Sequence, residues 1–129
     1  MHKPKAPLAK ITLDVWQADA KGRYDFQDHP HTEVRTVVGG KQPKRSNFRN
    51  RIRLMTDEQG YYEYETIKPG SYSVGRQTRP SHIHYMAHAS GHARLITQLY
   101  FKGDPHIKND SFGENLGAAN SPLIITTQK

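Results

Sequence analysis

The feature that most constrains the fold is the alternation His82-Ile83-His84, which ends the stretch PGSYSVGRQTRPSHIH at positions 69–84. On an extended strand successive side chains point to opposite faces, so the two imidazoles share one face while Ile83 points into a core. Pro80 fits the start of such a strand, because proline lacks the N–H that a central position donates. The pattern therefore predicts a strand with two imidazoles on one face, and two imidazoles so placed can share a metal ion.

The composition limits the chemistry that such a site can use. There is no cysteine, which excludes disulfides, thiolate zinc sites and a cysteine nucleophile, and leaves nitrogen and oxygen atoms as metal ligands. A net charge of +7 favours anionic substrates. The length of 129 residues predicts one domain. Because long apolar runs and a signal-like N-terminus are absent, we expect a cytoplasmic protein with no membrane segment.

Short strands separated by turn residues account for most of the chain. Alternating apolar and polar residues, or short apolar runs between turn signals, predict strands at residues 11–16, 51–56, 60–67, 81–88, 95–101 and 122–127. We expect the second and third of these to form a hairpin, with a positive φ at Gly60. Residues 25–47 are polar without periodicity and predict a long loop. With no sustained helical periodicity, the pattern favours an all-β sandwich or barrel.

Two tyrosines sharpen the metal hypothesis. Tyr72 follows a Pro-Gly turn ten residues before His82, and Tyr24 follows a second glycine turn near the end of the first predicted strand. A phenol becomes a ligand only when a strongly Lewis-acidic ion takes its proton, as Fe(III) does. Two phenolates with two imidazoles would favour the ferric state. The spacing alone does not establish that these tyrosines meet the histidines.

The sequence resembles the intradiol ring-cleavage dioxygenases, and the likeness covers most of the chain in the order of the family. The matching segments are DVWQADAKGRY at 14–24, NFRNRIRLMTDEQGYYEYETIKPGSY at 47–72, RPSHIH at 79–84 and LITQLYFKGDP at 95–105. The resemblance implies a single-domain β-sandwich with long active-site loops and little helix. It also implies that residues 1–129 form one catalytic domain, which is shortened at its N-terminus relative to the family.

The resemblance also implies a site and a reaction. Tyr24, Tyr72, His82 and His84 would bind Fe(III), with Tyr72 and His84 axial and the other two equatorial. Tyr72 would also act as a base when the substrate displaces it, and Arg79 would stabilise negative charge on the ring. Gln98 would lie beside the substrate as a further polar residue of the site. The implied enzyme inserts both atoms of dioxygen into a catecholic ring and yields a cis,cis-muconate, which is aromatic catabolism by an oxidoreductase; which catechol it uses is open.

Alternative interpretations stand beside these assignments. The two histidines could be hydrogen-bonded or exposed strand residues, the tyrosines could be packing residues, and Arg79 could pair with an acidic neighbour on the surface. The chain could then be a non-catalytic, transthyretin-like β-sandwich binding module with a degraded metal site. It could also be a cupin-type Fe(II) protein, whose site would need no phenolate.

The remaining histidines and basic residues carry weaker signals. We expect the other histidines to be solvated or structural, namely His29, His31, His88, His92 and His106. The basic residues between positions 41 and 53 are most simply a solvated surface, since the stacking aromatics of a nucleic-acid site are not interleaved with them. We therefore expect a catecholic small molecule and dioxygen as partners, no nucleic acid, and self-association into a homo-oligomer.

Overall fold

The computed structural model describes residues 8–24, 35–36, 50–112 and 117–128. Nearly all of the regular structure in these residues is β-strand. The strands are β1 (Thr12–Gln17), β2 (Arg35–Thr36), β3 (Arg51–Met55), β4 (Tyr64–Glu65), β5 (Tyr72–Val74), β6 (Gln77–Arg79), β7 (His82–His88), β8 (Leu95–Phe101) and β9 (Ile124–Ile125). A short 3₁₀ helix spans Ala118–Asn120. No helix in the described part of the chain is long and apolar enough to cross a lipid bilayer.

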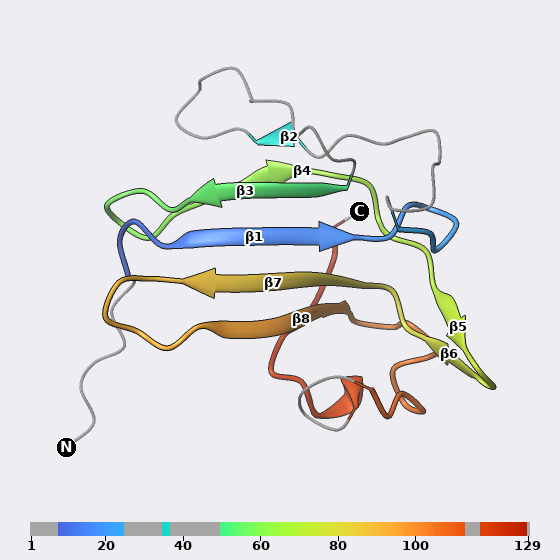
Figure 1. Cartoon of the computed structure of the whole chain (residues 1–129). Coiled ribbons are helices and arrows are strands. Elements are labelled where there is room, and N and C mark those ends of the chain that lie inside the picture. The colour runs from blue at the N-terminus through green and yellow to red at the C-terminus, as the bar shows by residue number, and fades with distance from the viewer. Residues whose placement is uncertain (1–7, 25–34, 37–49, 113–116, 129) are drawn as a thin grey trace.

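The central element is a five-stranded sheet in the order β3-β1-β7-β8-β9, in which only the β8–β9 pair is parallel. Figure 1 shows β3, β1, β7 and β8 side by side in this order. Two small sheets accompany it, β2 with β4 and the hairpin of β5 with β6. The hairpin projects at the end of the sheet where β1 finishes and β7 begins (Figure 1). This all-β, sandwich-like arrangement confirms the predicted fold class.

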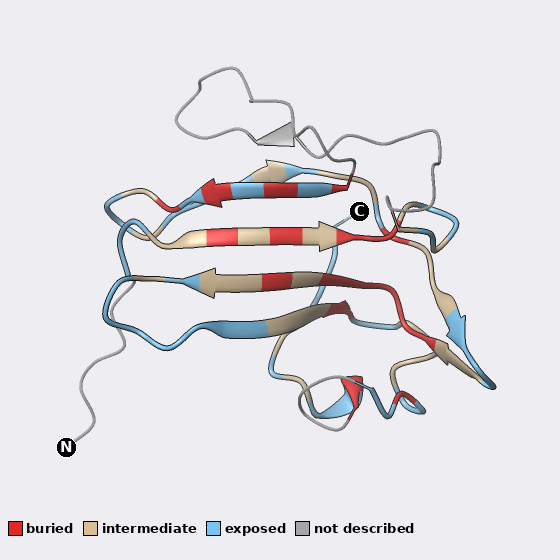
Figure 2. Cartoon of the chain, in the orientation of Figure 1, coloured by how far each residue is buried: buried red, intermediate tan, exposed pale blue. Residues whose placement is uncertain are grey.

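One face of the large sheet carries the hydrophobic core. Burial alternates along β1 and β3, as the period-two pattern requires when one face is packed and the other is open (Figure 2). Ile83 is 5% exposed and points into this core, as predicted from its place between the two histidines. The buried members of the core are Leu13, Val15, Ile52, Leu54, Ile83, Tyr85 and Phe101. The opposite face therefore remains for polar side chains.

The four long strands lie within one residue of their predicted bounds, whereas the last strand is shorter than predicted. The predicted hairpin of residues 51–56 with 60–67 is wrong. Its turn exists, with Gly60 at φ 81° and its N–H donated to Asp57 O at 3.1 Å. However, the second strand is reduced to β4, which pairs with β2 and not with β3.

Contacts across the core explain why β4 leaves β3. Tyr64 Oη contacts Tyr85 Oη, and Tyr85 lies on the packed face of β7. Just beyond β4, Thr66 Oγ1 donates to Gln17 Oε1 at 2.9 Å, and Gln17 Nε2 donates to Ile67 O at 2.8 Å. These bonds hold the segment over the sheet rather than beside it. Apart from β2, the predicted long loop lies outside the described residues.

Candidate metal centre

Two backbone turns bring Tyr24 and Tyr72 to the same end of the sheet. Asp19 builds the first turn, since its Oδ1 accepts hydrogen bonds from the N–H groups of Lys21 and Arg23 at 2.8 and 3.0 Å. Gly70 N then donates to Asp19 O at 2.8 Å, which joins the second turn to the first. Tyr24 and Tyr72 follow these two turns directly.

The turns can approach only because both contain glycine. Gly22 has φ +79°, and a Cβ there would collide with the Ser71 carbonyl. A Cβ on Gly70 would collide with the Ala20 carbonyl and would lie 2.6 Å from Gly22 N. Since real Cβ atoms do not come so close to backbone, both positions require glycine. The two glycine turns singled out in the sequence thus pack backbone against backbone.

The two imidazoles come from the start of β7 and lie on the face of the sheet opposite the hydrophobic core. His82 is 2% exposed and His84 is half-buried. His82 Nδ1 lies 2.7 Å from Pro80 O, so this nitrogen carries the proton and donates it to the carbonyl. Its Nε2 is left with a lone pair that points to the tyrosines. The start of β7 is itself fixed, because Ser81 Oγ donates to Pro69 O at 2.6 Å.

The four side chains converge on one point. Tyr24 Oη lies 2.9 Å from His84 Nε2, 3.4 Å from His82 Nε2 and 3.4 Å from Tyr72 Oη. Tyr72 Oη lies 3.3 Å from His82 Nε2, and the two Nε2 atoms lie 3.1 Å apart. Among these four described residues, Tyr72 and His84 form the one pair that is not hydrogen-bonded. Sequence reasoning named all four, and the structure brings them together.

The cluster holds more lone pairs than protons. Each phenol has one proton, and His84 Nε2 has at most one, while His82 Nε2 has none because Nδ1 carries the proton. Three protons at most therefore serve five contacts of 2.9–3.4 Å. Such separations are those of donor atoms that surround one ion with bonds of about 2 Å. A cation at the centre would satisfy every lone pair at once, so the residues fit a metal.

The protonation of the cluster also suits a metal. Burial lowers the pKa of His82 to about 4, and burial followed by the charges of His82, Arg79 and Arg51 lowers the pKa of His84 to about 3. Both imidazoles are therefore neutral ligands at pH 7. Burial, and then the hydrogen bond with Tyr72, raises the pKa of Tyr24 far above its ordinary value. This phenol ionises only if a strong Lewis acid takes its proton.

Among the described residues, the two phenols are placed to complete a donor set with the two histidines. Within the part of the chain that the structure describes, no group of three or more His, Asp or Glu side chains is placed to hold a metal ion. The two histidines at the start of β7 therefore find their partners in tyrosine oxygens. A carboxylate-based site, such as many Fe(II) and Mn(II) proteins use, is not available from these residues.

Arg79 lies beside the cluster in a buried polar network. Its Nε donates to Asp110 Oδ1 at 2.9 Å, and its Nη2 donates to Gln98 Oε1 at 2.8 Å and to Tyr100 Oη at 3.3 Å. Burial opposes the charged form of Arg79, but the Asp110 carboxylate outweighs it and the pKa is raised. Arg79 thus does pair with an acidic residue, but in the interior rather than on the surface. Gln98 also lies opposite His84 on β8.

Sequence reasoning missed Trp16, Asp110 and Tyr100. Trp16 had a local signal, since it is an aromatic residue in the polar phase of a strand whose apolar residues are Leu13 and Val15. Asp110 and Tyr100 had none, because their roles depend on contacts with Arg79. The other predicted histidines behave as expected where they are described, with His88 and His92 exposed. His29 and His31 lie outside the described part of the chain, as do four residues of the basic stretch at 41–53, namely Lys41, Lys44, Arg45 and Arg49.

Comparison with known proteins agrees with this geometry. A family model described as a dioxygenase matches residues 2–129. The protocatechuate 3,4-dioxygenase beta chain of Burkholderia cepacia is 38% identical over 124 residues, which are 93% of this chain and 49% of that protein. The catechol 1,2-dioxygenase of Acinetobacter baylyi is 33% identical over 118 residues, which are 81% of this chain and 34% of that protein.

The solved structures that are similar to this chain are also dioxygenases. The 3-chlorocatechol 1,2-dioxygenase from Rhodococcus opacus 1CP superposes with a TM-score of 0.68 at 27% identity, over 94% of this chain and 46% of that chain. This chain thus spans half or less of the length of these similar proteins. Because the family match extends over nearly all of its residues, the chain belongs to the intradiol ring-cleavage dioxygenase family.

Proposed function

We propose that this chain is the catalytic part of a non-haem Fe(III) intradiol dioxygenase, which inserts both atoms of dioxygen into a catecholic ring to give a cis,cis-muconate. The observation that carries the proposal is the convergence of two phenol oxygens and two imidazole nitrogens, in which five of the six atom pairs lie 2.9–3.4 Å apart. Ferric iron suits this donor set, since it is acidic enough to ionise a buried phenol. Bound there, it would draw electron density from a catechol ring and make the ring reactive towards dioxygen.

Tyr24, Tyr72, His82 and His84 would hold the iron. Tyr72 as a phenolate would accept a proton from a substrate hydroxyl as the catechol enters, which is a general-base role. His82 would remain a fixed ligand, because the Pro80 carbonyl holds its ring through Nδ1.

Arg79 would stabilise negative charge that develops on the substrate ring. A buried guanidinium acts strongly on nearby charge, because little water screens it. Its direction is fixed by Asp110 and Gln98, so it would not need to reorganise during the reaction. Gln98 would hold Arg79 and lie beside the substrate.

The similar proteins indicate which substrates to test. Their names include protocatechuate, catechol, chlorocatechol and hydroxyquinol dioxygenases. All four compounds share two adjacent ring hydroxyls. The net charge of +7 would attract the anionic members of this set. We propose a substrate of this class, and no nucleic acid partner.

Metal analysis and the visible spectrum of the purified protein test the proposal. We expect about one iron per chain, a reddish tyrosinate-to-Fe(III) charge-transfer band, and oxygen uptake with muconate formation on at least one of the four catechols. Tyr24→Phe and Tyr72→Phe should bleach or shift the band and depress activity. Tyr61→Phe, at a side chain that is 53% exposed, serves as the control that should leave both unchanged.

Two results would contradict the proposal. A colourless, iron-free protein that consumes no oxygen with any catechol would support the non-catalytic, transthyretin-like binding module. A protein that binds iron equally well after both Tyr→Phe changes would support a site without phenolates, such as the cupin-type Fe(II) alternative.

A further inference from the structure

The two histidines of the cluster are oriented in different ways. The ring of His82 is held by a hydrogen bond from Nδ1 to Pro80 O at 2.7 Å. In the described part of the chain, His84 Nδ1 makes no corresponding hydrogen bond, and the polar contacts of His84 are those of Nε2 with Tyr24 and His82. A metal-ligating histidine nearly always has its second nitrogen fixed by a polar partner. His84 therefore needs another means of orientation.

An aromatic stack supplies that means. The indole of Trp16 lies parallel to the His84 ring, with the centroids 5.0 Å apart and the planes at 2°. On the outer side, the Arg51 guanidinium lies over the same indole, 5.2 Å from its centroid. Parallel stacking restricts rotation of the imidazole about its Cβ–Cγ bond, because any rotation out of plane loses ring contact.

The strand register builds this stack. Trp16 on β1 is the direct cross-strand partner of Arg51 on β3 and of His84 on β7. The three side chains therefore stand in one row on the open face of the sheet, next to each other across three strands. Directly opposed side chains are the closest neighbours that a sheet offers. Any slip of the β1–β7 register would break the stack and move His84 away from the cluster.

We propose that Trp16 is a positioning residue for His84, which fixes the plane of the imidazole so that Nε2 points to the centre of the four-residue cluster. Arg51 holds the outer face of the indole by a cation–π contact. The role of the stack in metal binding rests on the proposed function, whereas its role in ring orientation does not.

Nuclear magnetic resonance of the metal-free protein tests the orientation. We expect the His84 ring to hold one rotamer about its Cβ–Cγ bond in the wild type, seen in the three-bond couplings between its β protons and ring Cδ2. In Trp16→Leu these couplings should average over several rotamers. Trp16→Phe keeps a flat ring in the stack and should restore a single rotamer. His82 is the internal control, since the Pro80 carbonyl should keep its couplings constant in every variant.

Competition with a ferric chelator tests the consequence for the metal. We expect Trp16→Leu to weaken Fe(III) binding about 10–100-fold, as loss of an outer partner of a metal-ligating histidine does. Trp16→Phe should recover most of the affinity. Arg51→Gln leaves the indole in place and should weaken binding less than Trp16→Leu. Trp16→Met, which also removes the flat ring, replaces Trp16→Leu if that variant does not fold.

The outcomes separate the two proposals. A wild type that binds no iron overturns the proposed function, while the couplings of His84 still decide the role of Trp16. A single His84 rotamer and unchanged iron affinity in Trp16→Leu, or in Trp16→Met where it stands in, would overturn the positioning role even in an active iron enzyme.

Discussion

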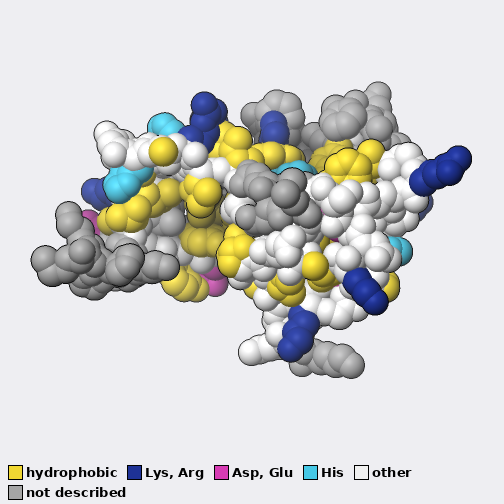
Figure 3. All heavy atoms as spheres, turned by 90° about the horizontal axis from the view of Figure 1, so that it is seen from below, with side chains coloured by type: hydrophobic (Ala, Val, Ile, Leu, Met, Phe, Trp, Pro, Cys, Tyr) yellow, Lys and Arg dark blue, Asp and Glu magenta, His cyan; other side chains and the backbone are white. Residues whose placement is uncertain are grey.

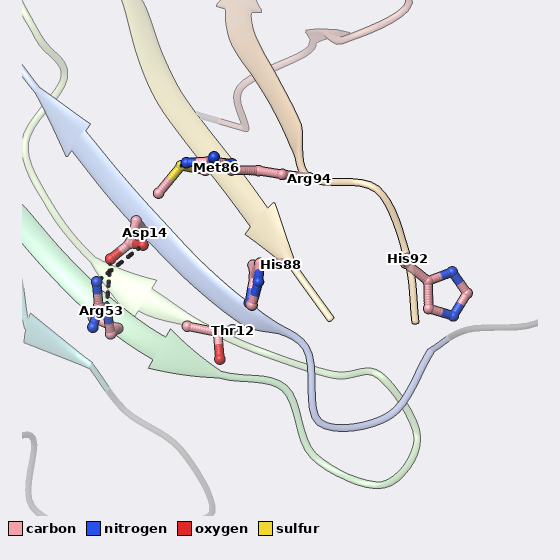
Figure 4. Close-up of a pocket in the computed structure, with 7 residues that line it drawn as sticks. All are labelled: Thr12, Asp14, Arg53, Met86, His88, His92 and Arg94. Atoms are coloured by element: carbon pink, nitrogen blue, oxygen red, sulfur yellow. Dashed lines mark hydrogen bonds and ion pairs between the residues drawn. The ribbon is translucent and has the colours of Figure 1, made fainter. Parts of the chain in front are cut away.

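The two ends of β1 and β7 carry similar residues with different consequences. At one end lie the histidines of the cluster, the ion pair of Arg79 with Asp110, and a glycine turn at Gly22. At the other end lie His88 on the same face of β7, the ion pair of Arg53 with Asp14, and a glycine turn at Gly91. Figure 4 shows His88, Arg53 and Asp14 around an open pocket, with His92 on the loop beyond β7 and its ring away from His88.

The difference between the ends is enclosure. His82 is 2% exposed and the Arg79–Asp110 side chains are 6% and 0% exposed, whereas Arg53 is 74% exposed and His88 lies at the surface. The far end also leaves Leu95 and Ile96 56% and 46% exposed, and hydrophobic side chains are visible at the surface in Figure 3. Residue type and strand phase alone therefore do not make a site. At the enclosed end, the turns at Gly22 and Gly70 pack against each other and carry Tyr24 and Tyr72 to the histidines.

We expect the largest difference between the two ends when their histidines are replaced. Replacing His82 or His84 by alanine removes one of the four proposed metal ligands. We therefore expect loss of the iron and of its colour, and a fall in activity of more than about tenfold. His88→Ala removes an exposed imidazole from the same face of the same strand and should change none of these. Iron content, the visible spectrum and oxygen uptake measure the contrast. Iron retained at wild-type affinity in His84→Ala would show that His84 is not a ligand.

We expect the next largest difference between the two ends, in unfolding free energy, when their ion pairs are broken. Asp110→Asn removes the charge opposite Arg79 and leaves a buried guanidinium without a counter-ion, which costs about 3–5 kcal/mol of unfolding free energy. Asp14→Asn breaks the exposed pair with Arg53 and should give no measurable change, since water screens both groups. Chemical denaturation of both variants measures the difference. Equal and small effects would mean that the Arg79 pair is open to solvent in solution.

If Arg79 has the proposed catalytic role, Asp110 would act on the reaction through it. Its Oδ2 accepts a hydrogen bond from Ala118 N at 3.0 Å, so the carboxylate joins the guanidinium to the C-terminal segment. Asp110→Asn can keep this bond while it weakens the hold on Arg79. We therefore expect kcat to fall more than iron content does, which a purely structural role would not produce.

The imidazole pair could be predicted from the sequence because it depends on local geometry. Alternation along a strand places His82 and His84 on one face without any knowledge of the rest of the chain. The tyrosines are different, since Tyr24 and Tyr72 lie 48 positions apart and meet only through the paired glycine turns. Family resemblance named them, and spacing could not. Long-range placement of this kind is decided by packing that a single segment does not encode.

Dependence on distant segments also explains why the predicted hairpin was wrong and why Asp110 was missed. The hairpin at residues 51–67 had good local signals, yet Tyr64 gains more by packing over Tyr85 than by extending the sheet beside β3. Asp110 sits in a polar stretch that reads as an ordinary turn, and only the fold shows its carboxylate enclosed with Arg79. Prediction from sequence therefore succeeded for faces of strands and failed where partners come from distant segments.

We expect the smallest difference between the two ends when their turn glycines are replaced. This comparison measures the effect of the close approach of the turns at Gly22 and Gly70. Gly22 and Gly91 have nearly equal φ values, +79° and +78°, so alanine at either position meets the same left-handed strain of about 1–2 kcal/mol. A Cβ at Gly91 meets nothing within 4 Å, whereas a Cβ at Gly22 meets the Ser71 carbonyl. Gly22→Ala should therefore lose a further 1–3 kcal/mol or so of unfolding free energy, as overpacking does. The difference between the two variants measures the packing of one turn on the other, and it should be accompanied by a shifted iron spectrum in Gly22→Ala alone, because that packing holds Tyr72 next to Tyr24.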